Sequence, residues 1–305
     1  MGNLRFSAES RNDLPAVGDW VALSEYDEDK ALIHAVYPRH SIIERQAVGK
    51  FGKKQIIATN IDFGLIVQAV DRDFNINRLE RYLTICHASR VAPVVVFSKI
   101  DLISEPELET ILHEIGERIK EVPIFPVSSE TRDGYSKLAA MIESGKTYCL
   151  LGSSGVGKST LLNHISGHEM MKTSEISASV QKGRHTTSHR ELIILENGGI
   201  LIDNPGMREV GITDTGGGLE MTFDAILQLA EDCKYKDCTH LHEDGCAILE
   251  AIGNGDLDED SYENYQKMER EKTHFESSVH ERRKKDKKFG KMMKDVVKNR
   301  KKNKY

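Results

Sequence analysis

The alternation of apolar and polar positions divides the 305-residue chain into four regions. In residues 1–58, short alternating runs broken by Gly, Pro and Asp are typical of β-strands in a small barrel or sheet. In residues 59–212, β-branched apolar runs alternate with helical patterns. This alternation indicates an α/β domain with a parallel-rich sheet and helices on both faces. Residues 213–281 are mostly helical in pattern, and residues 282–305 are strongly basic.

Six apolar runs in the second region predict the strands of one sheet. The Asn197-Gly198 pair between the last two runs favours a tight hairpin. Helical patterns over 77–90 and 106–120 fill two of the intervals, and Cys86 and Cys149 fall at core positions. The predicted strands are 63–70, 93–97, 122–127, 147–152, 190–195 and 198–203.

A glycine-rich run, GSSGVGKS at residues 152–159, follows one of these strands and opens a predicted helix. The backbone N–H groups of such a loop and the positive end of the helix converge on an anion. Lys158 is placed to reach the β- and γ-phosphates of a nucleotide, and Ser159 to ligate Mg²⁺. We therefore predict nucleotide contacts from Gly152, Ser153, Ser154, Gly155, Val156, Gly157, Lys158, Ser159 and Thr160.

A second phosphate-side motif, DNPG at residues 203–206, follows the last predicted strand. Asp203 is suited to hold magnesium through water, and the Gly206 amide to contact the γ-phosphate. Between the two motifs, Thr186 and Thr187 both offer a hydroxyl that would complete the Mg²⁺ shell. The sequence does not choose between these threonines.

The run Ser98-Lys99-Ile100-Asp101 follows a buried strand and predicts a guanine-reading box. Asp101 would accept hydrogen bonds from N–H groups that distinguish guanine from adenine, and the Lys99 stem would lie along the base. Ser128 and Ser129, after the next strand, would place a backbone amide at the guanine oxygen. The expected ligands are GTP and GDP with Mg²⁺.

Three cysteines and a histidine lie close together in the pattern Cys233-x4-Cys238-x-His240-x5-Cys246. Three thiolates and one imidazole suit a closed tetrahedral Zn²⁺ site, one ion per chain, with a structural role. His242 is an alternative ligand to His240. Cysteines clustered for a metal rather than paired for disulfides favour the cytoplasm.

The order of the motifs is unusual, because the base box precedes the phosphate-binding loop. Cutting an ordinary small GTPase after its Asp-x-x-Gly strand and joining the old ends gives this order with the same site. The chain resembles the RsgA (YjeQ) family of circularly permuted ribosome-assembly GTPases in the segment DLPAVGDWVAL, the base box, GSSGVGKST, KGRHTT, DNPGMRE and the cysteine cluster. The resemblance covers nearly the whole chain.

The resemblance implies a GTPase of late small-subunit maturation that binds rRNA in the GTP state and leaves after hydrolysis. It selects His240 as the zinc ligand and suggests His185 as the group that aligns water, since Met207 stands where many GTPases have Gln. The family usually has Asn or Thr at the position of Ser98, so we expect this shorter side chain to steady the base less. The implied domains are a partial OB-type β-barrel (1–58), a permuted GTPase domain (59–212), a zinc-binding helical domain (213–281) and a basic tail (282–305).

Charge adds one feature to this picture. Residues 282–305 contain thirteen Lys or Arg against two Asp, although the chain as a whole carries a net charge of −6. Such a tail is either solvated or a phosphate-seeking arm for nucleic acid. No run of 18 apolar residues occurs, so we expect no membrane partner, and we expect a monomer.

Two other functions fit parts of the pattern. A nucleotide-gated RNA-binding module with negligible hydrolysis would suit Met207. A P-loop ATPase or small-molecule kinase would suit the phosphate-binding loop but neither Asp101 nor the cysteine cluster.

Overall fold

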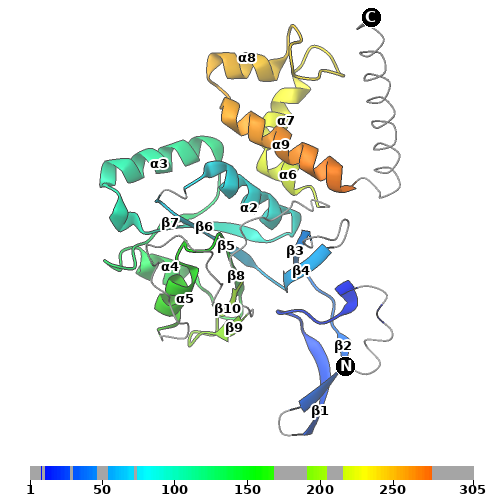
Figure 1. Ribbon diagram of the computed structural model, residues 1–305, viewed down its shortest axis with the longest axis vertical. Coiled ribbons are helices and arrows are strands. Elements are labelled where there is room, and N and C mark those ends of the chain that lie inside the picture. Colours follow the sequence, from blue (N-terminus) through cyan, green and yellow to red (C-terminus); the bar gives the residue numbers. More distant parts are fainter. Residues whose placement is uncertain are drawn as a thin grey trace, which may run out of the picture.

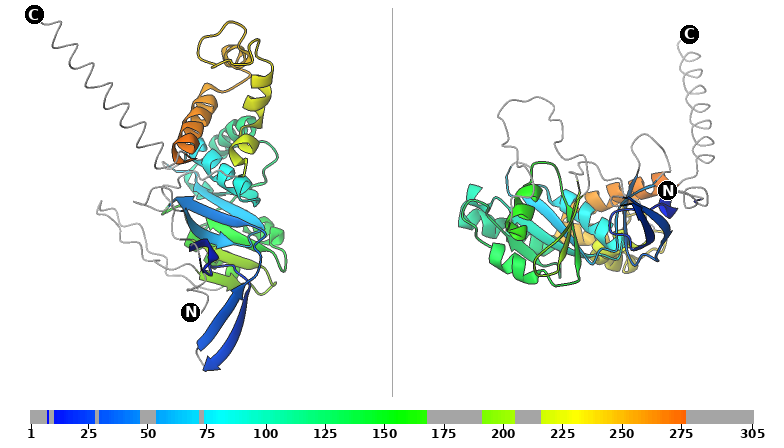
Figure 2. Two further views of the ribbon diagram at one scale, coloured as in Figure 1. Left: turned by 90° about the vertical axis from the view of Figure 1, so that its right-hand side faces the viewer. Right: turned by 90° about the horizontal axis from the view of Figure 1, so that it is seen from below.

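The computed structural model describes residues 8, 11–27, 30–46, 54–71, 74–167, 191–204 and 216–276. A central α/β part carries the hairpin of β1 (Val21–Asp27) and β2 (Lys30–Val36) at one end and the C-terminal helices at the other (Figures 1 and 2). Among the helices in these ranges, none is both long and apolar enough to cross a membrane.

The central part is built on one six-stranded sheet with the order β7-β6-β5-β8-β10-β9. Neighbouring strands are parallel except for the edge strand β9, which is antiparallel to β10. All six strands expected from the apolar runs are therefore confirmed. Their bounds are β5 Phe63–Ala69, β6 Ala92–Ser98, β7 Ile124–Pro126, β8 Thr147–Leu151, β9 Glu191–Ile194 and β10 Ile200–Asp203.

The hairpin between β9 and β10 is also confirmed. The Leu195 amide donates to the Gly199 carbonyl at 2.8 Å, and the Gly198 amide donates back to the Leu195 carbonyl at 2.9 Å. Gly198 takes a φ of +82°, which suits the left-handed position of a three-residue hairpin loop.

Helices cover both faces of this sheet, because alternate strand residues point to opposite sides. Helices α2 (Ile76–Ala88) and α3 (Glu105–Arg118) pack on one face through residues that include Leu83 and Ile115. Helices α4 (Tyr135–Met141) and α5 (Lys158–Ser166) pack on the other face, through Leu138 and Leu161 among others. The two helices expected over 77–90 and 106–120 are confirmed, and Cys86 and Cys149 are fully buried in the core.

The N-terminal strands form two separate hairpins, β1 (Val21–Asp27) with β2 (Lys30–Val36), and β3 (Ile42–Gln46) with β4 (Lys54–Thr59). Strands were expected here. Within the described residues the two hairpins belong to separate two-stranded sheets and do not join into one. The buried Asp19 carboxylate ties the segment together by accepting from Arg39 Nη2 at 2.6 Å and Thr59 Oγ1 at 2.7 Å.

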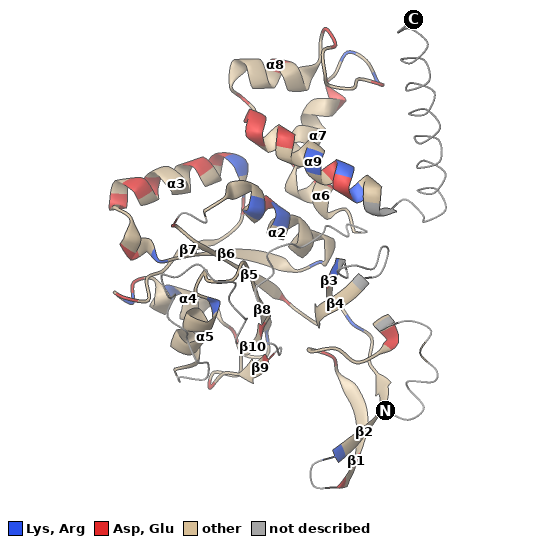
Figure 3. Cartoon of the chain, in the orientation of Figure 1, with Lys and Arg blue, Asp and Glu red and all other residues tan. Residues whose placement is uncertain are grey.

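The C-terminal part consists of α6 (Gly218–Thr222), α7 (Asp224–Glu231), α8 (Ala247–Asn254) and α9 (Glu259–Glu276). Its small core contains Phe223, Cys246 and Met268. Acidic side chains predominate along α3, whereas acidic and basic side chains alternate on α9 (Figure 3). This part packs against α2 through α6 and α9. The left view of Figure 2 shows the yellow and orange helices next to the cyan helix α2.

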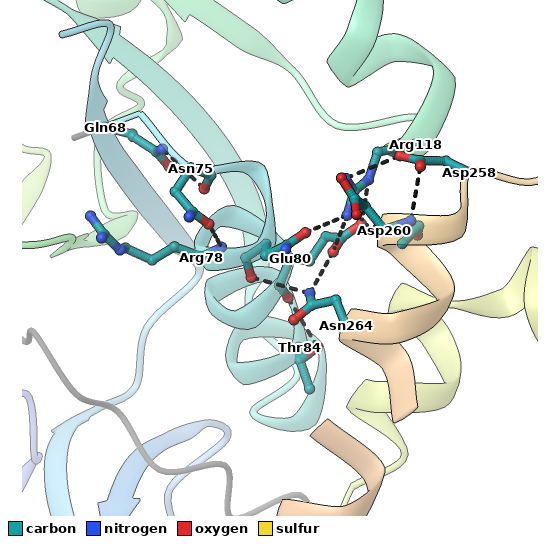
Figure 4. A network of polar contacts seen from close by, with 11 residues as sticks. Gln68, Asn75, Arg78, Glu80, Thr84, Arg118, Asp258, Asp260 and Asn264 are labelled. Atoms are coloured by element: carbon teal, nitrogen blue, oxygen red, sulfur yellow. Dashed lines mark hydrogen bonds and ion pairs between the residues drawn. The ribbon is translucent and has the colours of Figure 1, made fainter. Parts of the chain in front are cut away.

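A buried carboxylate joins the central and C-terminal parts (Figure 4). Glu80 of α2 is 2% exposed and accepts from Arg118 Nε at 3.0 Å and Arg118 Nη2 at 2.8 Å. From α9, Asn264 Nδ2 donates to the same carboxylate at 2.6 Å and Ser261 Oγ at 3.3 Å. Burial raises the pKa of Glu80, against the opposing effect of the Arg118 charge. The network therefore connects α2, α3 and α9 through one buried carboxylate.

Candidate functional site

The glycine-rich loop connects β8, in the middle of the sheet, to the N-terminus of α5. Gly152 has a φ of +142°, and a Cβ there would lie 2.3 Å from the Val67 carbonyl oxygen, so only glycine fits. Gly157, with a φ of +91°, caps α5, which begins at Lys158. The free amides of the first turn of α5 therefore lie at the end of the loop, as an anion site requires.

Lys158 and Asp203 are both buried in this site, and the charge of each affects the pKa of the other. Lys158 is 7% exposed, and its Nζ donates to the carbonyl oxygens of Gly152 at 3.0 Å and Ser153 at 2.6 Å. Burial lowers the pKa of Lys158 to about 8, opposed by the charge of Asp203. Burial likewise raises the pKa of Asp203, at the end of β10, to about 6, opposed by Lys158.

The surroundings of Asp203 fit a magnesium ion. Within the described residues, its buried Oδ1 oxygen has no hydrogen-bond partner. A buried carboxylate oxygen without a partner is costly unless a cation or bound water satisfies it. Ser159, the second residue of α5, supplies a hydroxyl from the same loop, and hydroxyl and carboxylate oxygens are ligands that Mg²⁺ accepts.

The base box lies at the end of β6. Ser98 is buried, and its Oγ donates to the Val156 carbonyl oxygen of the phosphate-binding loop at 2.6 Å. The short side chain of Ser98 therefore still links the box to the loop. Lys99 has a φ of +62°, and its Nζ donates to Asp71 Oδ2 at 2.8 Å.

Asp101 is exposed and oriented by the segment after β7. The buried Ser128 hydroxyl donates a short hydrogen bond to Asp101 Oδ1 and accepts from the Glu130 amide at 3.2 Å. The Ser129 hydroxyl lies 3.0 Å from the Tyr135 hydroxyl. The Ile100 amide donates to the Val127 carbonyl at 3.4 Å, so the two predicted base-side segments are brought together.

The strand order accounts for the unusual motif order. Strands β6, β8 and β10 are parallel, so their carboxyl ends lie at the same edge of the sheet. Ser98, Gly152 and Asp203 stand at or next to these ends, although they are far apart in the chain. The site is thus assembled by the sheet, whichever motif comes first.

Several predicted residues lie outside the described residues. They are His185, Thr186, Thr187, Gly206 and Met207, together with the basic tail 282–305. The remaining loop residues are Ser154 and Thr160, which are partly exposed, and Gly155, which is exposed and has a φ of +86°.

Two contacts of the site were missed from the sequence. Asp71 pairs with Lys99, and Arg78 of α2 reaches Ser153 of the loop, its Nη1 lying 3.3 Å from the Ser153 Oγ. Asp71 directly follows the predicted strand 63–70, which was a usable signal for a site residue. Arg78 carried no such signal, because a single arginine in a helical pattern is typical of a solvated face.

The cysteine cluster forms a second candidate site. The ligand atoms of Cys233, Cys238, His240 and Cys246 all lie within 4.8 Å of one another, and His242 is not in this group. His240 Nδ1 lies 3.5 Å from Cys233 Sγ and 3.4 Å from Cys246 Sγ, and the two sulfurs are 3.9 Å apart. Edges of about 3.5–3.8 Å are expected for a tetrahedron with zinc bond lengths of about 2.0–2.3 Å. The cluster therefore fits a metal ion.

The loop that carries His240 is held by Glu243. Its carboxylate accepts from the Thr239 amide at 2.9 Å and the Leu241 amide at 3.0 Å, as well as from the Thr239 hydroxyl. These hydrogen bonds hold the pKa of Glu243 well below its usual range, and the bond from the Thr239 hydroxyl has the largest effect. His240 has a φ of +56°, a strained value for a non-glycine residue that this closed loop maintains.

Comparison with family models gives two matches. The RsgA GTPase model matches residues 36–213, which include the base box, the loop and Asp203. An ABC transporter model matches residues 135–297 and begins after the base box. The two matches share the glycine-rich loop, a feature of many nucleotide-binding families.

Curated relatives and solved structures agree with the first match. The Small ribosomal subunit biogenesis GTPase RsgA 1 of Bacteroides thetaiotaomicron is 39% identical, over 94% of this chain and 80% of that protein. The Small ribosomal subunit biogenesis GTPase RsgA of Methanosarcina acetivorans is 41% identical, over 83% of this chain and 69% of that protein.

Two crystal structures share the fold. That of YjeQ from Thermotoga maritima matches with a TM-score of 0.62 and 26% identity, over 90% of this chain and 88% of that one. That of YloQ, described as a circularly permuted GTPase, matches with a TM-score of 0.60 and 23% identity, over 89% and 85%. With the permuted sheet and the assembled site, these matches show that the chain belongs to the RsgA GTPase family.

Proposed function

We propose that this protein hydrolyses GTP to GDP and phosphate and acts in late maturation of the small ribosomal subunit. It would bind the rRNA of that subunit in the GTP state and leave after hydrolysis. The observation that carries the proposal is the meeting of the base box, the phosphate-binding loop and Asp203 at one edge of the sheet. The chain also shares about 40% identity with relatives named for small-subunit biogenesis.

Guanine would be read by Asp101. Its carboxylate accepts the two N–H groups that guanine presents and adenine lacks, and the Ser128 hydroxyl holds the carboxylate in place. The Lys99 stem would lie along the base, with its ammonium group held by Asp71. The backbone at Ser128 and Ser129 would face the guanine oxygen.

The phosphates would lie over residues 152–160, with Lys158 at the β- and γ-phosphates. Ser159 would ligate Mg²⁺ and Asp203 would hold it through water, which suits the unpaired Asp203 oxygen. Bound Mg²⁺ neutralises charge on the phosphates during their transfer. Either Thr186 or Thr187 would complete the shell, and the Gly206 amide would contact the γ-phosphate.

Intrinsic hydrolysis should be slow. Met207 is apolar and cannot orient water, so we assign that task to His185, in the segment between the two phosphate motifs. We expect the small subunit to stimulate hydrolysis by completing the site. Coupling hydrolysis to arrival at the subunit would then time release of the protein.

The Cys3His cluster would hold one structural zinc ion per chain. Three thiolates and an imidazole leave no open position for catalysis. Elemental analysis of protein purified without chelator should therefore return one zinc per chain, and a result without zinc would refute this assignment. We further propose that the chain is divided into three domains, residues 1–58, 59–212 and 213–281, and a tail, residues 282–305. The protein would be a monomer and would act in the cytoplasm.

The deciding experiment measures binding of the purified protein to each ribosomal subunit with a GTP analogue or GDP, and phosphate release with and without subunits. We expect tight binding to the small subunit only with the GTP analogue, and faster multiple-turnover phosphate release when that subunit is added. Nucleotide-dependent binding without turnover would indicate an RNA-binding module instead. Equal competition by ATP and GTP would refute the guanine assignment.

A further inference from the structure

Helix α2 contacts the phosphate-binding loop at Ser153. Arg78 and Tyr82 lie one turn apart on α2, and both side chains meet Ser153. The Arg78 Nη1 atom donates to Ser153 Oγ at 3.3 Å. The Tyr82 hydroxyl shares a hydrogen bond with the same serine, and burial raises the pKa of Tyr82 to about 12.

Ser153 is held on its other side as well. It is 5% exposed, and its carbonyl oxygen accepts from Lys158 Nζ at 2.6 Å. Its side chain therefore bonds to α2, while its backbone bonds to Lys158, the lysine proposed to bind the phosphates. A displacement of Ser153 would move both the start of the loop and the anchor of Lys158.

Helix α2 is itself a fixed support for this contact. Its N-terminus is capped by Asn75, whose side chain accepts from the Arg78 amide at 2.8 Å. In its middle, Glu80 is locked between Arg118 and Asn264 (Figure 4). Side chains on such an element can position a neighbouring loop with little loss of freedom on ligand binding.

We propose that Arg78 and Tyr82 are positioning residues of the nucleotide site, which act through Ser153 to hold the phosphate-binding loop in its ligand-ready curve. The inference rests on the proposed binding of guanine nucleotides and adds to it an element outside the sequence motifs. The loop motif accepts any residue at the position of Ser153. The inference gives this serine the role of connecting α2 to the loop.

The test compares GDP and guanosine affinities of Arg78→Ala, Ser153→Ala and the double variant by titration calorimetry. We expect Arg78→Ala to weaken GDP binding by about tenfold, the value of one charge-assisted hydrogen bond. Guanosine binding should be unchanged, because guanosine has no phosphate for the loop to hold. The double variant should bind GDP no more weakly than the weaker single variant, since both changes remove the same hydrogen bond.

One control variant and one further test variant complete the experiment. Arg81→Ala removes the next arginine of α2, which pairs with Glu271 of α9 at 2.8 Å, and should leave GDP affinity unchanged. Tyr82→Phe removes only a hydroxyl and should weaken GDP binding by a smaller factor than Arg78→Ala. If Arg78→Ala does not fold, Ser153→Ala and Tyr82→Phe still test the contact.

Three outcomes would overturn the inference. They are unchanged GDP affinity in Arg78→Ala and Ser153→Ala, fully additive losses in the double variant, or equal losses for GDP and guanosine. Failure of the unaltered protein to bind GDP would overturn the proposed function together with this inference. Normal GDP binding by the unaltered protein, with no effect of the variants, would overturn the inference alone.

Discussion

Ser98 shows how one hydroxyl joins the two halves of the nucleotide site. It ends β6, where the base box begins, and its hydrogen bond of 2.6 Å goes to the Val156 carbonyl oxygen in the phosphate-binding loop. Both residues are buried, so neither group has water as a ready substitute. A shorter residue than Asn or Thr at this position therefore still makes the link, by lying close to the loop.

The first prediction concerns this link. Ser98→Ala leaves the Val156 carbonyl oxygen without its donor, which should cost about 1–3 kcal/mol of stability and weaken GDP binding. Ser104→Ala is the matched control, because it removes the cap of α3 at an exposed site away from the loop. It should cost about 1 kcal/mol of stability and leave GDP affinity unchanged. Equal GDP affinities in the two variants would show that Ser98 does not support the site.

The second prediction concerns protons at Lys158, whose pKa burial lowers to about 8. Bound phosphates favour the charged form of Lys158, so its pKa rises when GDP binds. At a pH above the pKa of Lys158 in the free protein, GDP binding is therefore accompanied by proton uptake. GDP affinity should therefore fall as pH rises above about 8, by at most a factor of about ten per pH unit. Calorimetry in two buffers of different ionisation enthalpy measures the proton uptake directly. Guanosine should show none, and uptake by guanosine would assign the proton elsewhere.

Some residues of the site could be read from the sequence because their role is local. The run at 152–159 predicts its own curve and helix start, and Cys233, Cys238, His240 and Cys246 lie within fourteen positions. The contacts Ser98–Val156 and Arg78–Ser153 span 58 and 75 positions. No periodicity connects such distant positions, so only the folded sheet reveals them.

Helix α2 carries both the buried Glu80 network and a more exposed ion pair, so the two interactions can be compared on one helix. Glu80 and Arg118 have side chains that are 2% and 7% exposed, whereas Arg81 and Glu271 are 21% and 23% exposed. Both pairs attach neighbouring elements to the same helix. Removing one partner of a buried pair leaves the other uncompensated, whereas water replaces a missing partner at the surface.

The third prediction follows from this contrast. Glu80→Ala should lower the free energy of unfolding by about 3–5 kcal/mol, because Arg118 and Asn264 lose their shared acceptor. Arg81→Ala should cost about 1 kcal/mol or less. Denaturant unfolding at neutral pH gives both values, and limited proteolysis shows whether α9 stays bound to α2. Similar costs for the two variants would contradict the role of the buried network.

The strands of the central sheet were predictable because parallel strands buried on both faces read as continuous apolar runs. The spatial order of the strands was harder to predict, since it depends on the crossover helices and on the permutation. The N-terminal strands were predicted as a barrel or sheet, but the described residues place β1–β2 and β3–β4 in separate hairpins. Alternation predicts a strand and its faces, but not which neighbour closes the sheet.

Charge is divided unevenly along the chain. Residues 282–305 carry thirteen Lys or Arg against two Asp, whereas the chain as a whole has a net charge of −6. Residues 1–281 therefore carry a strongly negative net charge, which the phosphates of an RNA surface would repel. A basic tail that reaches phosphates would offset this repulsion and give binding a steep dependence on salt.

The last prediction tests this role of the tail, which lies outside the described residues. A chain that ends at Glu281 should bind the small subunit more weakly than the full chain in the presence of a GTP analogue. Its slope of log affinity against log salt should be shallower by about 0.7–0.9 for each phosphate that the tail no longer neutralises. Intrinsic GTP hydrolysis should be unchanged, since no proposed site residue lies in the tail, whereas stimulation should fall at limiting subunit concentration. A full-length variant with all thirteen basic residues of the tail replaced by Gln separates charge from length and should behave like the truncated chain. The same affinity and slope for all three proteins would leave the RNA contact to the Cys3His part and the N-terminal strands.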